Sequence, residues 1–285
     1  MTFSAFIAAH HDGIRLSGFL AVFALMALWE LLTPRRRARS PTRIRWMNNI
    51  GLIVLDTLLV RLVLPAAVLG TALYAAAHGW GVLHRLALAP ALAMPIAVVA
   101  LDLTIYLQHV MLHAVPTLWR LHRVHHADLD FDVTTGVRFH PFEILLSILV
   151  KCAAVIVIGA SPTAVVLFEV LLNATSLFTH GNVRLPAAFE RALRLVLVTP
   201  EMHRVHHSIE EDETNSNFGF NLSCWDRLFG TYRAAARLAQ PDMTIGIRTF
   251  RERRLCAWLP GMLAMPFIGP VSDYAINRRS WRGRP

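Results

Sequence analysis

The sequence predicts an all-α protein: an integral-membrane helical bundle of about four to five membrane segments with a cytoplasmic helical cap that carries a histidine cluster. Three observations predict it. Hydrophobic residues make up 55% of the 285 residues and charged residues only 16%. With a mean hydropathy of +0.46, this is more apolar chain than a soluble core can bury. The apolar residues gather in long blocks, and ten of the fourteen histidines fall between His109 and His207.

The apolar blocks are the expected membrane helices, and they cover Leu16–Leu32, Ile50–Ala77, Leu86–Leu107, Ile144–Gly159 and Thr163–Phe178. About 20 residues are needed to cross a hydrocarbon layer of ~30 Å, so the last two blocks are short. We expect them to form a tight membrane hairpin that turns at Gly159–Pro162, where glycine and proline end a helix. The first block lacks a basic leader and a small-residue cleavage site, so we expect it to stay as a membrane helix and not to be a signal peptide.

Arginines predict the topology. Six of them lie between Arg35 and Arg45, directly after the first block, and short basic loops remain on the cytoplasmic side of a membrane. From there the expected crossings return the chain to the cytoplasm near His109 and again before His180. The basic tail is expected to contact anionic headgroups on that side through Arg248, Arg251, Arg253, Arg254, Arg278, Arg279, Arg282 and Arg284.

Two other classes of protein are disfavoured. The net charge of +9 comes with no aromatic and basic motif of the kind that binds DNA or RNA, so we expect no nucleic-acid partner. The three cysteines, Cys152, Cys224 and Cys256, are far apart and form no CxxC pair. They predict neither a disulfide framework nor a metal–thiolate site, and we expect small, buried, apolar roles for them.

The pentapeptide HRVHH occurs twice, at His122–His126 and at His203–His207, 81 positions apart. On a helix its three histidines share one stripe, and the last two, being adjacent, can reach two different metal ions. His109 and His113 are four residues apart, which places both imidazoles on one helix face. Eight to ten histidines are enough for two metals. The set is His109, His113, His122, His125, His126, His140, His180, His203, His206 and His207.

The pattern excludes two known kinds of metal site. A zinc peptidase needs glutamate after the first histidine of HExxH, and here that residue is Val110. Ferritin-like di-iron proteins need ExxH, which does not occur. Imidazole alone does not choose among Zn, Cu, Fe and Ni. We expect Asp102, seven residues before His109, to support a histidine ligand without binding metal itself. The alternative is that Asp102 forms an ion pair with Arg61.

Six motifs follow one another along the chain: Asp102–His109 with His113, His122–His126, Phe139–Glu143, Thr179–Asn182, His203–His207, and Asn217–Gly219 with Trp225–Thr231. In this order they resemble the fatty acid hydroxylase / sterol desaturase superfamily of integral-membrane, histidine-rich di-iron oxygenases. The resemblance covers roughly Leu101–Tyr232, under half of the chain. The flanking helices and the tail carry no comparable signal.

The resemblance implies two non-haem iron ions, held by the histidines named above, with His140 either a tenth ligand or a supporting group. Asp102, Glu143 and Asn182 are the expected supporting residues, and Trp225–Thr231 is expected to shape the site without binding metal. We treat 1–285 as a single membrane-embedded domain, with N-terminal membrane helices in 16–100, the di-iron catalytic core in 101–232 and the basic tail in 233–285. We expect no ligand role for Arg123 and Arg204, because guanidinium has no acceptor, and assign them to headgroups or carboxylates.

The implied activity is an O2-dependent hydroxylation of a lipid C–H bond; a desaturase with the same centre is the alternative, and a histidine-lined metal transporter is the alternative outside the enzymes. The substrate, a fatty acyl chain, sterol-like lipid, carotenoid or ether lipid, stays open. No GxGxxG fingerprint or fused haem domain is evident, so we expect electrons from a separate reductase, ferredoxin or cytochrome. Arginine supplies all of the basic residues except Lys151, which we interpret as GC-rich bacterial coding and hence an inner-membrane location.

Overall fold

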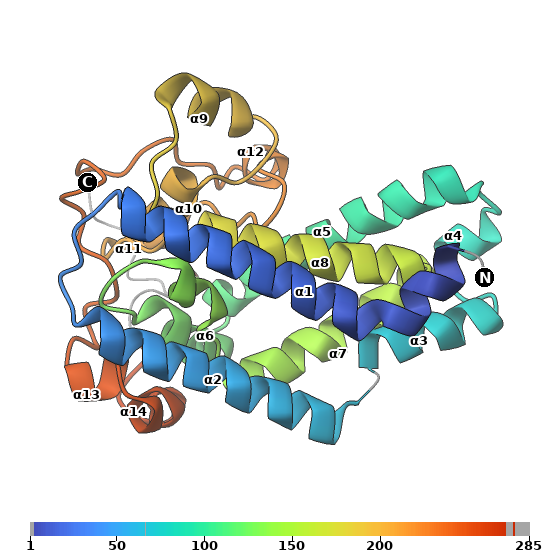
Figure 1. Ribbon diagram of the computed structural model, residues 1–285, viewed down its shortest axis with the longest axis horizontal. Helices are drawn as coiled ribbons and strands as arrows, with labels where there is room; N and C mark the ends of the chain where they lie inside the picture. Colours follow the sequence, from blue (N-terminus) through green and yellow to red (C-terminus); the bar gives the residue numbers. More distant parts are fainter. Residues whose placement is uncertain (1–2, 66, 272–275, 277–285) are drawn as a thin grey trace.

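The computed structural model describes residues 3–65, 67–271 and 276, and every regular element within them is a helix (Figure 1). The long helices are α1 (Phe3–Leu32), α2 (Thr42–Val63), α3 (Ala67–Ala77), α5 (Pro90–Ala114), α7 (Pro141–Ile158) and α8 (Pro162–Thr179). Five stretches are long and apolar enough to cross a membrane: Ala9–Leu32, Thr42–Arg85, Pro90–Ala114, Pro141–Ile158 and Pro162–Thr179. The predicted all-α membrane bundle is confirmed.

Two predicted boundaries were wrong. The first helix begins at Phe3, well before Leu16. The block Ile50–Ala77 is two helices, because Pro65 has no N–H to donate and disfavours helical backbone in the residue before it. Leu64 accordingly has φ −137° and ends α2. The short α4 (Val82–Arg85) then precedes α5.

The hairpin between α7 and α8 forms where the sequence predicts it. Gly159 ends α7 in the left-handed region, at φ 75°, which glycine adopts without steric cost. Ser161 then begins α8 by accepting a hydrogen bond from the Ala164 N–H, and Pro162 occupies the first turn. The short loop lets α7 and α8 lie antiparallel, so the chain leaves and re-enters the same end of the bundle.

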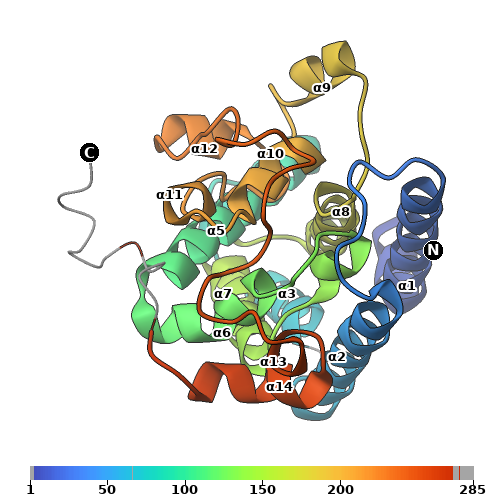
Figure 2. The same cartoon turned by 90° about the vertical axis from the view of Figure 1, so that its left-hand side faces the viewer.

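That end carries the cap (Figure 2). It holds α6 (Pro116–His126), η1 (Val133–Val137), α10 (Pro200–His206), α11 (Glu211–Thr214), α13 (Arg253–Cys256), α14 (Leu259–Ala264) and η2 (Met265–Phe267). Two further short helices, α9 (Ala187–Leu193) and α12 (Cys224–Leu228), lie beside the bundle (Figure 1). Of the expected basic tail, Arg278, Arg279, Arg282 and Arg284 lie outside the described residues. A cap of helices on one end of the bundle agrees with the prediction.

Three apolar cores hold these parts together. One joins α3, α5, α7 and α8 through buried residues such as Leu101, Ile105 and Phe168. A second lies in the cap, where Trp119 of α6 packs with Met262 and Met265. Outside the bundle, α1 keeps large leucines exposed, among them Leu20, Leu25 and Leu28, as a helix that faces acyl chains does. The third core packs Leu177 of α8 with Val133 and Val137 of η1, which places the end of α8 against the cap.

Candidate metal centre

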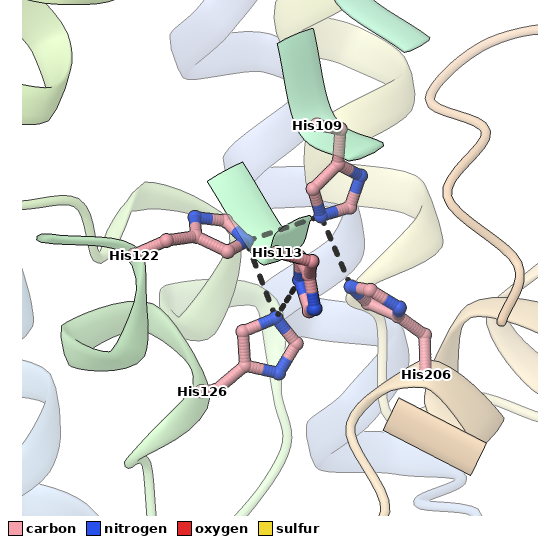
Figure 3. A group of neighbouring side chains, drawn as sticks. All are labelled: His109, His113, His122, His126 and His206. Carbon is pink, nitrogen blue, oxygen red and sulfur yellow. Dashed lines mark hydrogen bonds between the residues drawn. The ribbon is translucent and has the colours of Figure 1, made fainter. Parts of the chain in front are cut away.

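Nine histidines meet in the cap in two adjacent groups. Their side chains come from the end of α5, from α6, from the residue that ends α8, and from α10 and the residue after it. All are buried, and within each group the potential ligand nitrogens lie within 4.8 Å of one another. The five-histidine group is His109, His113, His122, His126 and His206 (Figure 3). The four-histidine group is His125, His180, His203 and His207.

Each HRVHH copy contributes histidines to both groups. In the first copy His122 and His126 join the five-histidine group while His125 joins the other. In the second copy the first and last histidines, His203 and His207, join the four-histidine group while His206 crosses over. Each copy therefore contributes a pair at i,i+4 spacing to one group and a single histidine to the other. The adjacent histidines of each copy therefore lie in different groups, as two separate ions would require.

Hydrogen bonds to one ring nitrogen define how most of these imidazoles face. Six histidines direct Nδ1 to an oxygen acceptor: His109 to Phe218 O at 2.8 Å, His113 to Asn215 Oδ1 at 3.1 Å, His122 to Glu143 Oε1 at 2.7 Å, His125 to Arg138 O at 3.2 Å, His180 to Ser176 O at 2.7 Å and His206 to Ser216 O at 2.7 Å. Because a carbonyl or carboxylate only accepts, Nδ1 carries the proton and Nε2 of the neutral ring keeps a free lone pair.

These free lone pairs converge. The Nε2 atom of His109 lies 3.1 Å from that of His122 and 3.0 Å from that of His206, and the same atoms of His125 and His180 are 3.1 Å apart. Two unprotonated nitrogens cannot share a hydrogen bond, so these contacts bring lone pairs together without a proton between them. In addition, His203 Nδ1 and both ring nitrogens of His207 are buried without a hydrogen-bond partner in the described structure. A cation in each group satisfies this arrangement.

Burial keeps the histidines neutral. It lowers the pKa of His122 to about 3 and that of His180 to about 4. Burial first, and then repulsion from neighbouring imidazoles, lowers the pKa well below the usual 6.5 for His125, His126, His203, His206 and His207. Metals bind the deprotonated ring. The site is therefore in its ligand form at neutral pH.

A loop after α11 supports the five-histidine group from behind. Its backbone carbonyls at Ser216 and Phe218 accept the bonds from His206 and His109. The fully buried Asp226 holds this loop, because its carboxylate accepts from the N–H groups of Phe218 at 2.7 Å and Gly219 at 2.9 Å and from the Thr231 hydroxyl at 2.7 Å. A Cβ on Gly219 would lie 2.8 Å from Asp226 Oδ2 and 2.9 Å from Val198 Cγ2, so only glycine fits there.

Comparison with known proteins adds the family. The family model described as "Fatty acid hydroxylase" matches residues 94–231. Ornithine lipid hydroxylase OlsE of Rhizobium tropici is 30% identical over 240 residues, which cover 80% of this chain and 69% of that protein. This chain belongs to the fatty acid hydroxylase family. Alkylglycerol monooxygenase of Homo sapiens is 30% identical over 54% of this chain and 34% of its own length, and cholesterol 25-hydroxylase of Mus musculus is 26% identical over 57% and 53%. No solved structure matches.

Membership of the fatty acid hydroxylase family makes the chain an oxidoreductase, as the motif order implies, and its five apolar helices make it a membrane protein. The matched segment contains every one of the nine grouped histidines. It also contains the Asn217–Gly219 and Trp225–Thr231 motifs that form the supporting loop. The family resemblance in the sequence and the geometry of the centre thus coincide on the same residues.

The tenth candidate histidine lies elsewhere. His140 belongs to neither group: its Nδ1 accepts from the Phe142 N–H and caps α7, and its Nε2 is 3.3 Å from Leu263 O, to which it donates. Of the expected supporting residues, Glu143 contacts His122 directly. Asp102 instead accepts from Trp225 Nε1 and Leu222 N, and Asn182 exchanges hydrogen bonds with the Arg36 backbone. Neither of these two bonds a histidine or Arg61.

The shared arginines of the two HRVHH copies have a structural role. Arg123 donates to the carbonyls of Met265, Ile268 and Pro270 and lies 4.7 Å from the centre of the Phe250 ring. Arg204 donates to Gly181 O and to Gln240, and its guanidinium lies 5.0 Å from the Phe131 ring. The predicted partners, headgroups and carboxylates, were wrong. Each arginine ties its histidine helix to a neighbouring segment through backbone or amide oxygens.

A buried ionic cluster lies under the four-histidine group. Arg45, expected in a basic surface loop, is 1% exposed and pairs with Asp128 at 2.6 Å and with Asp132 at 2.7 Å. The Arg45 guanidinium holds the pKa of Asp128 below its usual range, despite burial. Next to it Arg138 donates to Val124 O, and its own carbonyl holds His125. Sequence reasoning identified neither this cluster nor Asn215 and Ser216. Phe218 and Asp226 lie within the Asn217–Gly219 and Trp225–Thr231 motifs, the second of which was expected to shape the site.

Proposed function

We propose that the protein is a membrane-bound di-iron oxygenase that uses O2 and two externally supplied electrons to hydroxylate a C–H bond of a lipid. One observation carries the proposal: nine buried imidazoles converge in two adjacent groups of five and four. A metal carrier needs ligands near the middle of the bilayer between broken helices. Here the ligands gather in the cap, which favours catalysis over transport.

The residues fit a pair of irons. Neutral imidazole is a suitable ligand for iron. Because the family consists of oxidoreductases, the ion must be redox-active, whereas zinc would act only as a Lewis acid. When bound, such a pair supplies the oxidising power that activates O2 toward an unactivated C–H bond. We infer that the five-histidine group holds one ion and the four-histidine group holds the other, with His140 outside the ligand set.

The protein's own residues orient and support the histidine ligands and exclude water from the centre. Glu143 accepts from His122 Nδ1 and is the one carboxylate in direct contact with a grouped histidine among the described residues. It fixes that ring's tautomer and raises its basicity as a ligand. The carbonyls of Ser216, Phe218 and Ser176 do the same from the backbone. Burial of every ligand excludes bulk water, which protects a reactive centre from side reactions.

The substrate class follows from the relatives and the setting. The relatives are named for ornithine lipid, alkylglycerol and cholesterol, so lipids of several kinds are hydroxylated within the family. We infer a membrane lipid that reaches the centre from the bilayer. We place the centre on the cytoplasmic side of a bacterial inner membrane, because the arginine-rich segment after α1 lies at the cap end. The electron donor is a separate reductase, ferredoxin or cytochrome.

The test is a lipid analysis of bacterial cells that produce the protein under 18O2. The wild type is expected to yield a lipid that has gained one labelled oxygen atom, and the His125→Ala and His206→Ala variants are expected to yield none. His78→Ala, which alters an exposed histidine at the far end of the bundle, is the matched control and should retain the product. A product that has lost two hydrogens and gained no oxygen would identify a desaturase. Unchanged lipids in wild-type cells supplied with iron and a reductase would refute the proposal.

A further inference from the structure

Two short helices outside the cap, and the residues next to them, expose several large apolar side chains. In and around α9 and α12, Phe189, Leu195, Val196, Leu228 and Phe229 are each at least 50% exposed. We call these five residues the α9–α12 apolar surface. Protein surfaces that face water seldom expose so many large apolar side chains, so this surface indicates an environment other than water.

The surface lies beside membrane helices and not beyond their ends. The segment that contains α12 is fixed to α5 by Asp102, which accepts from Trp225 Nε1 at 2.8 Å and from Leu222 N at 3.2 Å. Asp102 is at the midpoint of α5, since 102 − 90 and 114 − 102 both equal 12 residues. One turn further along α5, Tyr106 stacks on Phe229 with ring centres 5.3 Å apart. On the other side, the Thr175 hydroxyl of α8 donates to Asn221.

The level of the two short helices can be followed along the bundle axis. Figure 1 shows α9 and α12 level with the cap-side part of the long helices, with α12 farther from the cap than α9. Beside this surface α5 exposes Leu107, the residue after Tyr106, on which Phe229 stacks. The α12 part of the α9–α12 apolar surface therefore lies against a membrane helix, next to an exposed apolar residue of that helix.

Arginines border this surface. Arg184, Arg191 and Arg227 are exposed around it. The neighbouring carboxylates bond other residues. Glu190 is buried and pairs with Arg194 and Thr199, and Asp226 is buried and hydrogen-bonded in the supporting loop. Within the described residues none of these arginines pairs with a carboxylate, although Arg227 donates to Ser223 O and Arg194 O and lies over the Tyr232 ring. Exposed apolar side chains next to such arginines are typical of helices that lie in the interface of a membrane with anionic lipids.

From these observations we propose that α9 and α12 form a monotopic insertion, which embeds the α9–α12 apolar surface among the acyl chains of the cap-side leaflet while its arginines contact anionic phospholipid headgroups. The insertion fixes the depth of the loop that supports His109, because Phe218 and Asp226 belong to the same segment as α12. The inference needs only the membrane-spanning bundle and is independent of the proposed reaction.

The test places an environment-sensitive probe at single positions. Leu195→Cys and Leu228→Cys, each in a Cys224→Ser background, are labelled with nitrobenzoxadiazole in the full-length protein, reconstituted in vesicles of phosphatidylcholine and phosphatidylglycerol. Leu238→Cys is the matched control, because Leu238 is also an exposed leucine, at 57%, and lies on the cap. Label on the unsubstituted Cys224→Ser protein gives the background from the other two cysteines, and Val196→Cys replaces any variant that does not reconstitute.

We expect the probes at 195 and 228 to be quenched by doxyl-labelled lipid and to be several-fold less sensitive to aqueous iodide than the probe at 238. Replacing phosphatidylglycerol by phosphatidylcholine should reduce the lipid quenching at both positions. Equal quenching by iodide at all three positions would overturn the proposal, since the surface would then face water and be open to a protein partner.

Discussion

Asp226 offers a sharp test of how the loop positions the five-histidine group. In Asp226→Ala the N–H groups of Phe218 and Gly219 lose their acceptor while they remain buried. Each unsatisfied buried N–H costs about 1–3 kcal/mol, so the loop geometry loses about 2–6 kcal/mol. Loss of a group that orients a metal ligand typically reduces metal affinity about 10–100-fold. The free energy lost at Asp226 is at least as large as the free energy that corresponds to this fall in affinity. It destabilises the loop that orients His109 and His206.

We therefore expect Asp226→Ala to lose the metal of the five-histidine group first and to retain that of the four-histidine group. The assay is metal content per chain after dialysis against chelators of increasing affinity. Thr231→Val is the matched control, because it removes one hydroxyl contact of Asp226 and leaves both backbone contacts intact. It should cost about 1 kcal/mol and retain both metals under mild chelation. If Asp226→Ala retained both metals as well as the wild type does, Asp226 would not position the ligands through the loop.

Three further predictions follow from the buried charges and imidazoles. Glu143→Leu removes the acceptor of His122 and should lower metal affinity about 10–100-fold, measured by chelator competition, with Glu143→Gln intermediate because it keeps an acceptor oxygen. Arg45→Met leaves Asp128 buried and unpaired and should lower the free energy of unfolding by about 3–5 kcal/mol in denaturant titrations; no change would show that the pair adds nothing. In metal-free protein, the lowered pKa values of His122 and His180 mean that the unfolded chain binds more protons below pH ~6.5. Its melting temperature should fall as the pH decreases from about 6.5 toward 4, and a constant melting temperature over that range would contradict the buried, neutral state.

The helical framework and the histidine positions could be predicted because each depends on local chemistry. Apolar length predicts a membrane helix, and Gly159 with Pro162 predicts the hairpin. The HRVHH spacing predicts the division of adjacent histidines, since it depends only on helix geometry. Pro65 also acts locally, and its effect on the block Ile50–Ala77 could have been recognised from the sequence.

The supporting contacts could not be predicted, because they join residues far apart in the sequence. Arg45 looks like one more arginine in a basic loop until the fold brings Asp128 to it, 83 positions away. Asp102 is close to His109 on the same helix, yet Trp225, 123 positions away, takes its carboxylate. The acceptors of His109 and His206 are backbone carbonyls, which have no side-chain signal at all.

The most direct test of the central claim is the metal content of detergent-purified protein from iron-supplemented cells, measured by mass spectrometry beside a His125→Ala/His206→Ala double variant that removes one ligand from each group. The account predicts close to two irons per wild-type chain and their loss in the variant. One iron or none in the wild type, or two irons retained in the double variant, would contradict the assignment of the two histidine groups to a di-iron centre.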